Sequence, residues 1–272
     1  MSEMKNAVGA GTGRSGDDLC AGNSVREFKI WADVLNYGKK ILKNAGIVEA
    51  DLDAWYLFEQ SFGISRAQYF LCARENIVGS TAQKMTAQEQ TGNSLESKNA
   101  LDCVELWLKE KLSAYENALK KRVARIPLQQ IIGQQEFMGL SFFVNEHVLI
   151  PRQDTETLAE EALKVLKPGM QVLDLCTGSG CILISLMKMC EGLYGTGSDI
   201  SEEALEVARK NACRLEVNAT FIRSSLFEHI SGRYDLIVSN PPYIRTSVIQ
   251  ELQEEVRLHD PFIALDGKED GL

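Results

Sequence analysis

The chain has 272 residues, of which 44% are hydrophobic and 25% are charged, so it can bury a full core and can hold two domains. Its net charge of −9 argues against a protein that grips nucleic acid over its whole surface, although a local basic patch could still do so.

The sequence has neither the apolar runs of a membrane protein nor the cysteine spacing of a zinc site. No apolar run reaches membrane-spanning length, and residues 1–24 lack the basic start and apolar centre of a signal peptide. The seven cysteines form no CxxC pair and no zinc-type spacing, so we interpret them as reduced thiols and expect no metal site. We therefore expect a cytoplasmic protein without a membrane partner.

The first half of the chain has the pattern of a helical domain. Residues 1–24 are rich in glycine and polar side chains, which predicts a disordered extension. Helical spacing of apolar residues then predicts a domain over 25–126, with a polar insertion at 79–99. The residues expected to face its core are Trp31, Val34, Leu35, Ile41, Leu42, Leu52, Trp55, Phe58, Phe62, Leu101, Val104, Trp107, Leu108, Leu112, Tyr115 and Leu119.

A basic cluster of Lys120, Lys121, Arg122 and Arg125 lies where the last of these helices should end. The interpretation we favour is a solvated helix end that complements the helix dipole. A local nucleic-acid contact is the alternative.

The second half alternates strands and helices. Apolar alternation at Leu140, Phe142 and Val144 predicts a β-hairpin connector over 127–147. In the domain expected over 148–272, a helix running to Lys167 is followed by strands at 171–175, 193–199, 220–223 and 234–239. Helices follow Gly180 and cover 202–211. This order predicts an α/β fold with a parallel sheet.

A glycine loop follows the first of these strands, in the run Asp174-Leu-Cys-Thr-Gly-Ser-Gly180. Gly178 lets backbone lie close to a ligand at the start of a helix. A dinucleotide fingerprint would need a third glycine where Leu183 stands, and the lysine of a Walker loop is absent. Asp174 suits the amino and sulfonium groups of S-adenosylmethionine, and Asp199, at the end of the next strand, suits ribose hydroxyls.

The fourth strand runs directly into Asn240-Pro-Pro-Tyr243. An amide or amino nitrogen bound by the Asn240 side-chain oxygen and the Pro241 carbonyl would be fixed with its lone pair pointing outward. The two prolines would hold these acceptors rigid, and Tyr243 offers a face on which a planar amide can pack. Such a site works by positioning and needs no strong base, so the three histidines need no role.

Several motifs in this order resemble the N5-glutamine methyltransferases of peptide chain release factors, the PrmC/HemK family. They are a helical bundle, Ile131-Ile-Gly133 with Phe137, Leu149-Ile-Pro-Arg152, the glycine loop and Asn240-Pro-Pro-Tyr243. The resemblance covers residue 28 to the end apart from the insertion. It implies a class I S-adenosylmethionine-dependent methyltransferase sheet (Rossmann-like) behind an N-terminal bundle.

The resemblance also implies the activity and the site. The substrate would be the glutamine of the Gly-Gly-Gln loop in class-1 release factors, with S-adenosylhomocysteine as the second product. The catalytic residues would be Asn240 and Pro241, and Pro242 and Tyr243 would join them in binding substrate. The residues implied for cofactor binding are Cys176, Thr177, Gly178, Ser179, Gly180, Asp199, Leu226 and Asn240.

The chain also departs from the family pattern. Cys176 stands where glycine is usual, Ser225 replaces an aspartate, and the chain stops shortly after Ala264-Leu-Asp-Gly267. We therefore expect a domain incomplete at its C-terminus, with the strand ending at Ser239 exposed at one edge. The alternatives are an amino-methyltransferase acting on DNA or RNA, and a truncated, non-catalytic binding protein.

Overall fold

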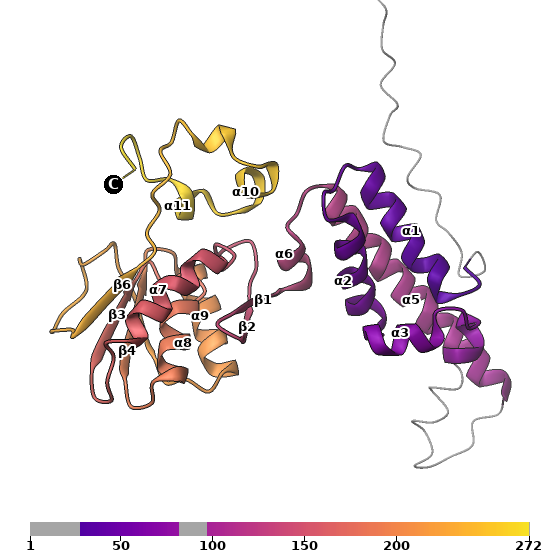
Figure 1. The fold of residues 1–272 in the computed structure, drawn as a ribbon, viewed down its shortest axis with the longest axis horizontal. Coiled ribbons are helices and arrows are strands. Elements are labelled where there is room, and N and C mark those ends of the chain that lie inside the picture. Colours follow the sequence, from indigo (N-terminus) through magenta and orange to yellow (C-terminus); the bar gives the residue numbers. More distant parts are fainter. Residues whose placement is uncertain (1–27, 82–96, 272) are drawn as a thin grey trace, which may run out of the picture.

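The computed structural model describes residues 28–81 and 97–271, which form two lobes joined by a short connector (Figure 1). The predicted extension at 1–24 and most of the predicted insertion lie outside these residues. At the edges of the insertion the prediction is wrong, because residues 79–81 and 97–99 are helical.

Four helices make up most of the N-terminal lobe: α1 (Trp31–Asn44), α2 (Ala50–Phe62), α3 (Arg66–Cys72) and α5 (Ser97–Val123). Gly63 ends α2 in a left-handed conformation that glycine adopts without strain. Ser65 then begins α3 with a capping box, in which its hydroxyl accepts from the Gln68 amide. Local chain chemistry therefore sets the turn between these two helices.

Aromatic rings fill the core of this lobe. Phe58 lies at its centre, with its ring centroid 5.7 Å from that of Trp55 and 6.1 Å from that of Tyr115. Most of the predicted core residues are buried. Leu52 and Leu101 are exceptions, because both lie on the exposed sides of their helices.

The connector is only partly a hairpin. The predicted hairpin is present as β1 (Gln134–Phe137) paired antiparallel with β2 (Leu140–Phe143). It is preceded by a short helix, α6 (Leu128–Ile132), which the sequence pattern did not predict. Gly133 ends α6 in a left-handed conformation and lets the chain turn into β1.

The second lobe is built on a four-stranded parallel sheet in the order β5-β4-β3-β6. The strands are β3 (Gln171–Leu175), β4 (Tyr194–Asp199), β5 (Thr220–Arg223) and β6 (Leu236–Ser239). The helices are α7 (Gln153–Leu163), α8 (Cys181–Met189) and α9 (Glu202–Arg214). All these elements were expected, although α7 ends four residues earlier than predicted.

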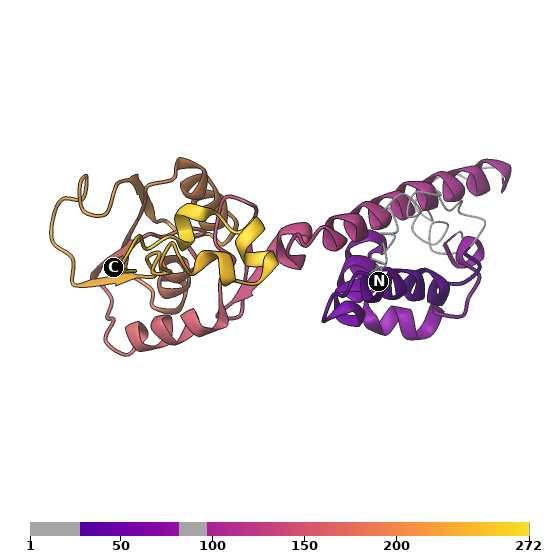
Figure 2. The same ribbon diagram turned by 90° about the horizontal axis from the view of Figure 1, so that it is seen from above.

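A C-terminal arm follows β6. It contains the short 3₁₀ helix η2 (Ile249–Glu251) and the α-helices α10 (Glu254–His259) and α11 (Phe262–Leu265). The arm is closed at its base, because the Ile244 amide donates to the Leu265 carbonyl and the Gly267 amide donates to the Ile244 carbonyl. From there it reaches across the sheet lobe toward the end of α5 (Figure 2).

Arg122 joins the arm to the helical lobe, which makes our interpretation of the basic cluster wrong for this residue. Its side chain is 6% exposed, and it contacts Asp53 of α2 at 2.6 Å and Glu255 of α10 at 2.7 Å. Burial raises the pKa of Asp53, and the hydrogen bond from Arg122 opposes that rise. Arg122 is therefore the shared cation of a largely buried ion-pair network between the lobes.

Removing this cation should strongly destabilise the protein. We expect Arg122→Met to lower the free energy of unfolding by about 3 kcal/mol, because Asp53 would stay buried without a partner. Urea denaturation measures the change, with Lys121→Met at an exposed neighbouring position as the control. A loss below about 1 kcal/mol for Arg122→Met would show that the pair contributes no more than a surface ion pair does.

Candidate active site

The carboxyl ends of three neighbouring strands lie level with one another. Leu175 of β3 is in register with Ser198 of β4 on one side and with Ser239 of β6 on the other. The Ser239 hydroxyl donates a 2.8 Å hydrogen bond to the Leu175 carbonyl oxygen. Neighbouring strands lie about 4.8 Å apart, so Asp199 and Asn240, the next residues along, flank the loop that follows β3.

Backbone hydrogen bonds hold the glycine loop against β4. The Thr177 amide donates to the Ser198 carbonyl at 2.9 Å, and the Gly178 amide donates to Asp199 Oδ2 at 2.9 Å. The two glycines differ in their surroundings. A Cβ added to Gly178 would meet nothing within 4 Å, whereas one added to Gly180 would come within 2.8 Å of the Ile184 side chain. Gly178 therefore leaves room for a ligand, and Gly180 allows close packing of α8.

Asp174 lies beneath this loop and is fully buried. Its Oδ2 accepts a 2.6 Å hydrogen bond from the Thr177 hydroxyl, whereas Oδ1 has no hydrogen-bond partner among the described residues. Burial raises the pKa of Asp174 to about 7, and the Thr177 hydroxyl opposes that rise. The structure therefore holds an unpaired carboxylate oxygen at the base of the loop.

Cys176 begins the loop in a left-handed conformation, with φ of 58°. Side chains other than glycine adopt this conformation at a cost, because Cβ crowds the backbone. Burial raises the pKa of the thiol to about 11, and the nearby charge of Asp199 adds to the rise. The thiol is therefore a neutral, unreactive group at neutral pH.

Asp199 remains partly exposed, and backbone groups fix its carboxylate. Its Oδ2 accepts from Gly178 and its Oδ1 accepts from the Ser201 amide at 3.0 Å. Each carboxylate oxygen can accept a second hydrogen bond, so both can still bind ribose hydroxyls. Leu226, in the loop after β5, is 57% exposed, and its carbonyl accepts a 2.8 Å hydrogen bond from the Ser224 hydroxyl.

Asn240 is half-buried and contacts α7. Its Nδ2 lies 3.5 Å from the Thr155 hydroxyl oxygen, so the contact orients the side-chain amide with Nδ2 toward α7. Pro241 and Tyr243 are exposed beside it, and Tyr243 is 66% accessible. Thr155 was not predicted as a site residue. Nothing in the sequence pattern places it next to Asn240.

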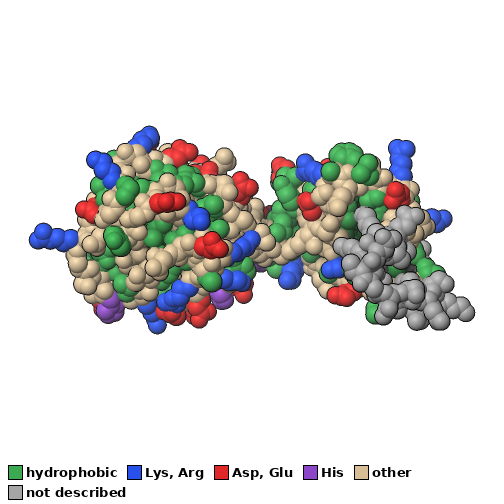
Figure 3. Space-filling model, turned by 90° about the horizontal axis from the view of Figure 1, so that it is seen from below, with side chains coloured by type: hydrophobic (Ala, Val, Ile, Leu, Met, Phe, Trp, Pro, Cys, Tyr) green, Lys and Arg blue, Asp and Glu red, His purple; other side chains and the backbone are tan. Residues whose placement is uncertain are grey.

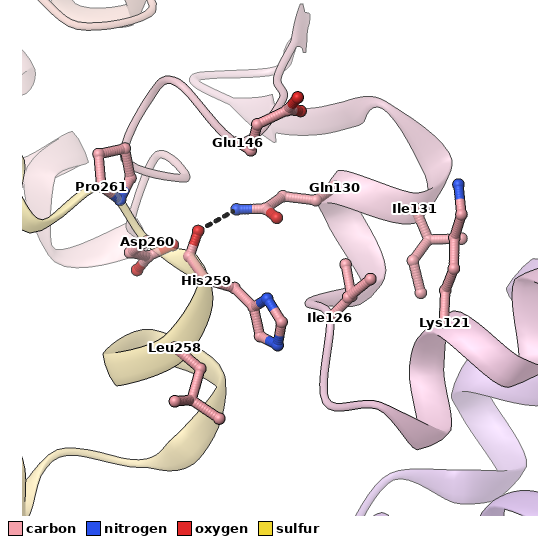
Figure 4. Close-up of a pocket in the computed structure, with 9 residues that line it drawn as sticks. All are labelled: Lys121, Ile126, Gln130, Ile131, Glu146, Leu258, His259, Asp260 and Pro261. Carbon is pink, nitrogen blue, oxygen red and sulfur yellow. Dashed lines mark hydrogen bonds between the residues drawn. The ribbon is translucent and has the colours of Figure 1, made fainter.

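A separate cavity of about 450 Å³ lies where the two lobes and the arm meet (Figure 4). Gln130 of α6 donates a 3.0 Å hydrogen bond across it to the His259 carbonyl of α10. None of the residues predicted to bind cofactor or substrate lines this cavity.

Residues 28–81 and 97–271 carry neither a membrane-spanning helix nor a cluster of metal ligands. No helix there combines the length and the apolar character that crossing a membrane requires. No group of three or more His, Cys, Asp or Glu side chains there is arranged to hold a metal ion.

Comparison with known proteins places this geometry in a class. The family model "Methyltransferase small domain" matches residues 153–258, and the model "PrmC N-terminal domain" matches residues 33–88. The sheet lobe is a doubly wound α/β fold, with a glycine loop after β3 and an acidic residue at the end of β4. Together with the match to the methyltransferase model, these features identify a class I methyltransferase fold. S-adenosylmethionine is the cofactor of this class.

Curated relatives identify the family. The release factor glutamine methyltransferase of Caulobacter vibrioides is 35% identical over 239 residues, which are 86% of this chain and 72% of the relative. This chain belongs to the family of release factor glutamine methyltransferases. The Agrobacterium fabrum relative is 48% identical over 162 residues, 57% of this chain and 56% of the relative. The Geobacter sulfurreducens relative is 46% identical over 164 residues, 60% of this chain and 58% of the relative. The chain thus spans little more than half the length of these two relatives.

The left-handed conformation of Cys176 leads to a stability prediction. We expect Cys176→Gly to raise the free energy of unfolding by about 0.5–1 kcal/mol, since relief of the backbone strain exceeds the entropic cost of glycine. Urea denaturation measures the change. Cys190→Gly is the matched control, because Cys190 has φ of −126° and carries no such strain, so this variant should lose stability. An equal loss of stability in the two variants would show that the backbone of Cys176 is not strained.

The raised pKa of Asp174 predicts a pH-dependent stability. Between about pH 4 and pH 7 the unfolded chain loses the Asp174 proton while the folded chain keeps it, so stability should fall as the pH rises. Asp174→Asn cannot titrate and should escape this loss. We expect the variant to gain stability relative to the parent protein from pH 5 to pH 8 in urea denaturation. A difference that does not change with pH would show that Asp174 is charged throughout.

Proposed function

We propose that this protein transfers a methyl group from S-adenosylmethionine to the side-chain amide nitrogen of the glutamine in the Gly-Gly-Gln loop of class-1 peptide chain release factors. The observation that carries the proposal is the level alignment of the glycine loop, Asp199 and Asn240 at one sheet edge. The relatives named release factor glutamine methyltransferase support the choice of substrate.

The residues at this edge fit the cofactor. S-adenosylmethionine supplies an electrophilic methyl group attached to a positively charged sulfur. The open space at Gly178 lets the loop backbone approach the methionine portion, and Asp199 keeps acceptor positions for the ribose. The unpaired oxygen of Asp174 offers a hydrogen-bond acceptor to the cofactor's amino group, and the positive charge of that group would favour loss of the Asp174 proton. Leu226 offers exposed apolar surface near the adenine side.

Asn240 and Pro241 would position the acceptor nitrogen. An amide nitrogen is a weak nucleophile, because its lone pair is shared with the carbonyl group. If Asn240 Oδ1 and the Pro241 carbonyl accept its two N–H groups, the lone pair turns toward the methyl carbon. The carbon–nitrogen bond would form as the carbon–sulfur bond breaks, with that electron pair staying on the sulfur of S-adenosylhomocysteine, and one N–H proton would then leave to solvent. Positioning of this kind can contribute on the order of 7–11 kcal/mol.

The partner we propose is the release factor itself, in the cytoplasm, where translation termination takes place. The exposed Tyr243 would pack against the planar glutamine amide. A nucleic-acid substrate has less support. Lysine and arginine are interspersed with aspartate and glutamate on the face drawn in Figure 3, and the net charge is −9.

The proposal is tested by methyl transfer. With labelled S-adenosylmethionine, we expect label on the Gly-Gly-Gln glutamine of a class-1 release factor and none on a variant with alanine in its place. Label on DNA or RNA instead would favour the amino-methyltransferase alternative. Cofactor binding without transfer to any of these would favour the binding-protein alternative.

Asn240→Ala should reduce the rate of transfer by at least about a hundredfold, because the nitrogen loses one of its two acceptors. Asn218→Ala, at an exposed position remote from the site, is the control and should keep full activity. Calorimetry with S-adenosylhomocysteine checks that the Asn240 variant still has a formed cofactor site. Transfer at the parent rate in that variant would remove Asn240 from the mechanism.

A further inference from the structure

Asn211 of α9 is a fully buried polar residue that sequence analysis did not assign to the site. Its side-chain amide makes three hydrogen bonds. Oδ1 accepts from the Phe143 amide at 2.7 Å, and Nδ2 donates to the Phe143 carbonyl at 3.0 Å and to the Ser179 carbonyl at 2.9 Å. A buried amide is stable only when its polar atoms are paired in this way.

The two bonds to Phe143 tie α9 to the hairpin. They bind both backbone groups of the last residue of β2, much as a neighbouring strand would. The Val207 side chain, four residues earlier on α9, packs in the same region beside Val144 and Val148. Fixing the hairpin therefore accounts for two of the three bonds and leaves the bond to Ser179 without a role there.

The third bond fixes the orientation of a peptide group in the glycine loop. Ser179 lies between Gly178, with φ of 55°, and Gly180, with φ of 78°. Glycine allows many backbone conformations, so this segment has little intrinsic preference for the observed one. Rotation of the Ser179–Gly180 peptide group would break the bond to Asn211. It would also break the 2.8 Å bond from the Gly180 amide to the Thr177 carbonyl.

We propose that Asn211 is a positioning residue for the methyl-transfer site, because it holds the Ser179 carbonyl and so keeps the glycine loop in its binding conformation. This inference rests on the proposed function in so far as the loop binds S-adenosylmethionine. Since one side chain bonds both the loop and Phe143, movement of the hairpin changes the loop as well.

Two variants at this position test the assignment against a matched control. Asn211→Asp keeps the acceptor for the Phe143 amide and loses both donors, and Asn211→Ser shortens the side chain. Val207→Ala removes buried apolar contacts from the same helix without changing any polar contact of the loop. Urea denaturation measures the stability of each variant. Calorimetry with S-adenosylmethionine and S-adenosylhomocysteine gives Kd, and hydrogen exchange of the Gly180 amide, which donates to the Thr177 carbonyl, reports on the loop.

We expect both Asn211 variants to bind the cofactor at least about tenfold more weakly, with faster exchange of the Gly180 amide. Val207→Ala should bind as the parent does, even where its loss of stability is equal. Equal Kd values in the Asn211 variants and the control would overturn the assignment. If the folded parent protein binds neither ligand, the proposed function fails instead. In that case the exchange data decide the inference, because unchanged exchange of the Gly180 amide would refute it. If neither Asn211 variant folds while Val207→Ala does, Asn211 is a folding residue and the assignment also fails.

Discussion

The parallel register at Leu175 is the constraint on which the rest of the sheet lobe depends. Because Leu175 is level with Ser198 and Ser239, the ends of β4, β3 and β6 lie side by side. A shift of one residue in either pairing would move a strand by about 3.3 Å and turn its side chains to the opposite face. The Ser239 hydroxyl donates to the Leu175 carbonyl and so reinforces the pairing of β3 with β6 at the carboxyl ends of these strands. Backbone hydrogen bonds therefore set the distance between the loop after β3 and Asn240, and under the proposed function they would set the distance between the cofactor and the acceptor nitrogen.

The loop after β3 combines strain, burial and tight packing in a few residues. Cys176 is left-handed without being glycine, Asp174 is buried with one oxygen unpaired, and Gly180 has no space for a side chain. Features of this kind persist where the surrounding structure holds them in place. Here Asn211 and Ser198 hold the loop from two sides, through the carbonyl of Ser179 and the amide of Thr177.

Much of the fold could be predicted from local pattern. The strand at 171–175 and the helix that ends at Gly63 followed from apolar periodicity and glycine chemistry, because both signals act over a few residues. The helix α6 was missed, since five residues are too few to show a helical period. The burial of Arg122 was also missed, because its partners Asp53 and Glu255 are 69 and 133 residues away along the chain. The contacts of Thr155 and Asn211 are of the same long-range kind. The motifs placed the candidate site at a strand edge, but the residues that support it belong to other elements.

The closed base of the C-terminal arm separates the surface of the arm from the strand end that positions Asn240. Ile244 is bonded to Leu265 and Gly267, so the chain leaves the sheet and returns to nearly the same place. The chain between those points forms an excursion, and away from residues such as Glu255, which pairs with Arg122, connections of this kind tolerate insertion, deletion and exchange of residues. Under the proposed function, substitutions in the excursion would reshape the surface offered to a protein substrate, while Asn240 would keep the position that β6 gives it. On that proposal, the surface that recognises the substrate would change in evolution without loss of the residues that carry out methyl transfer.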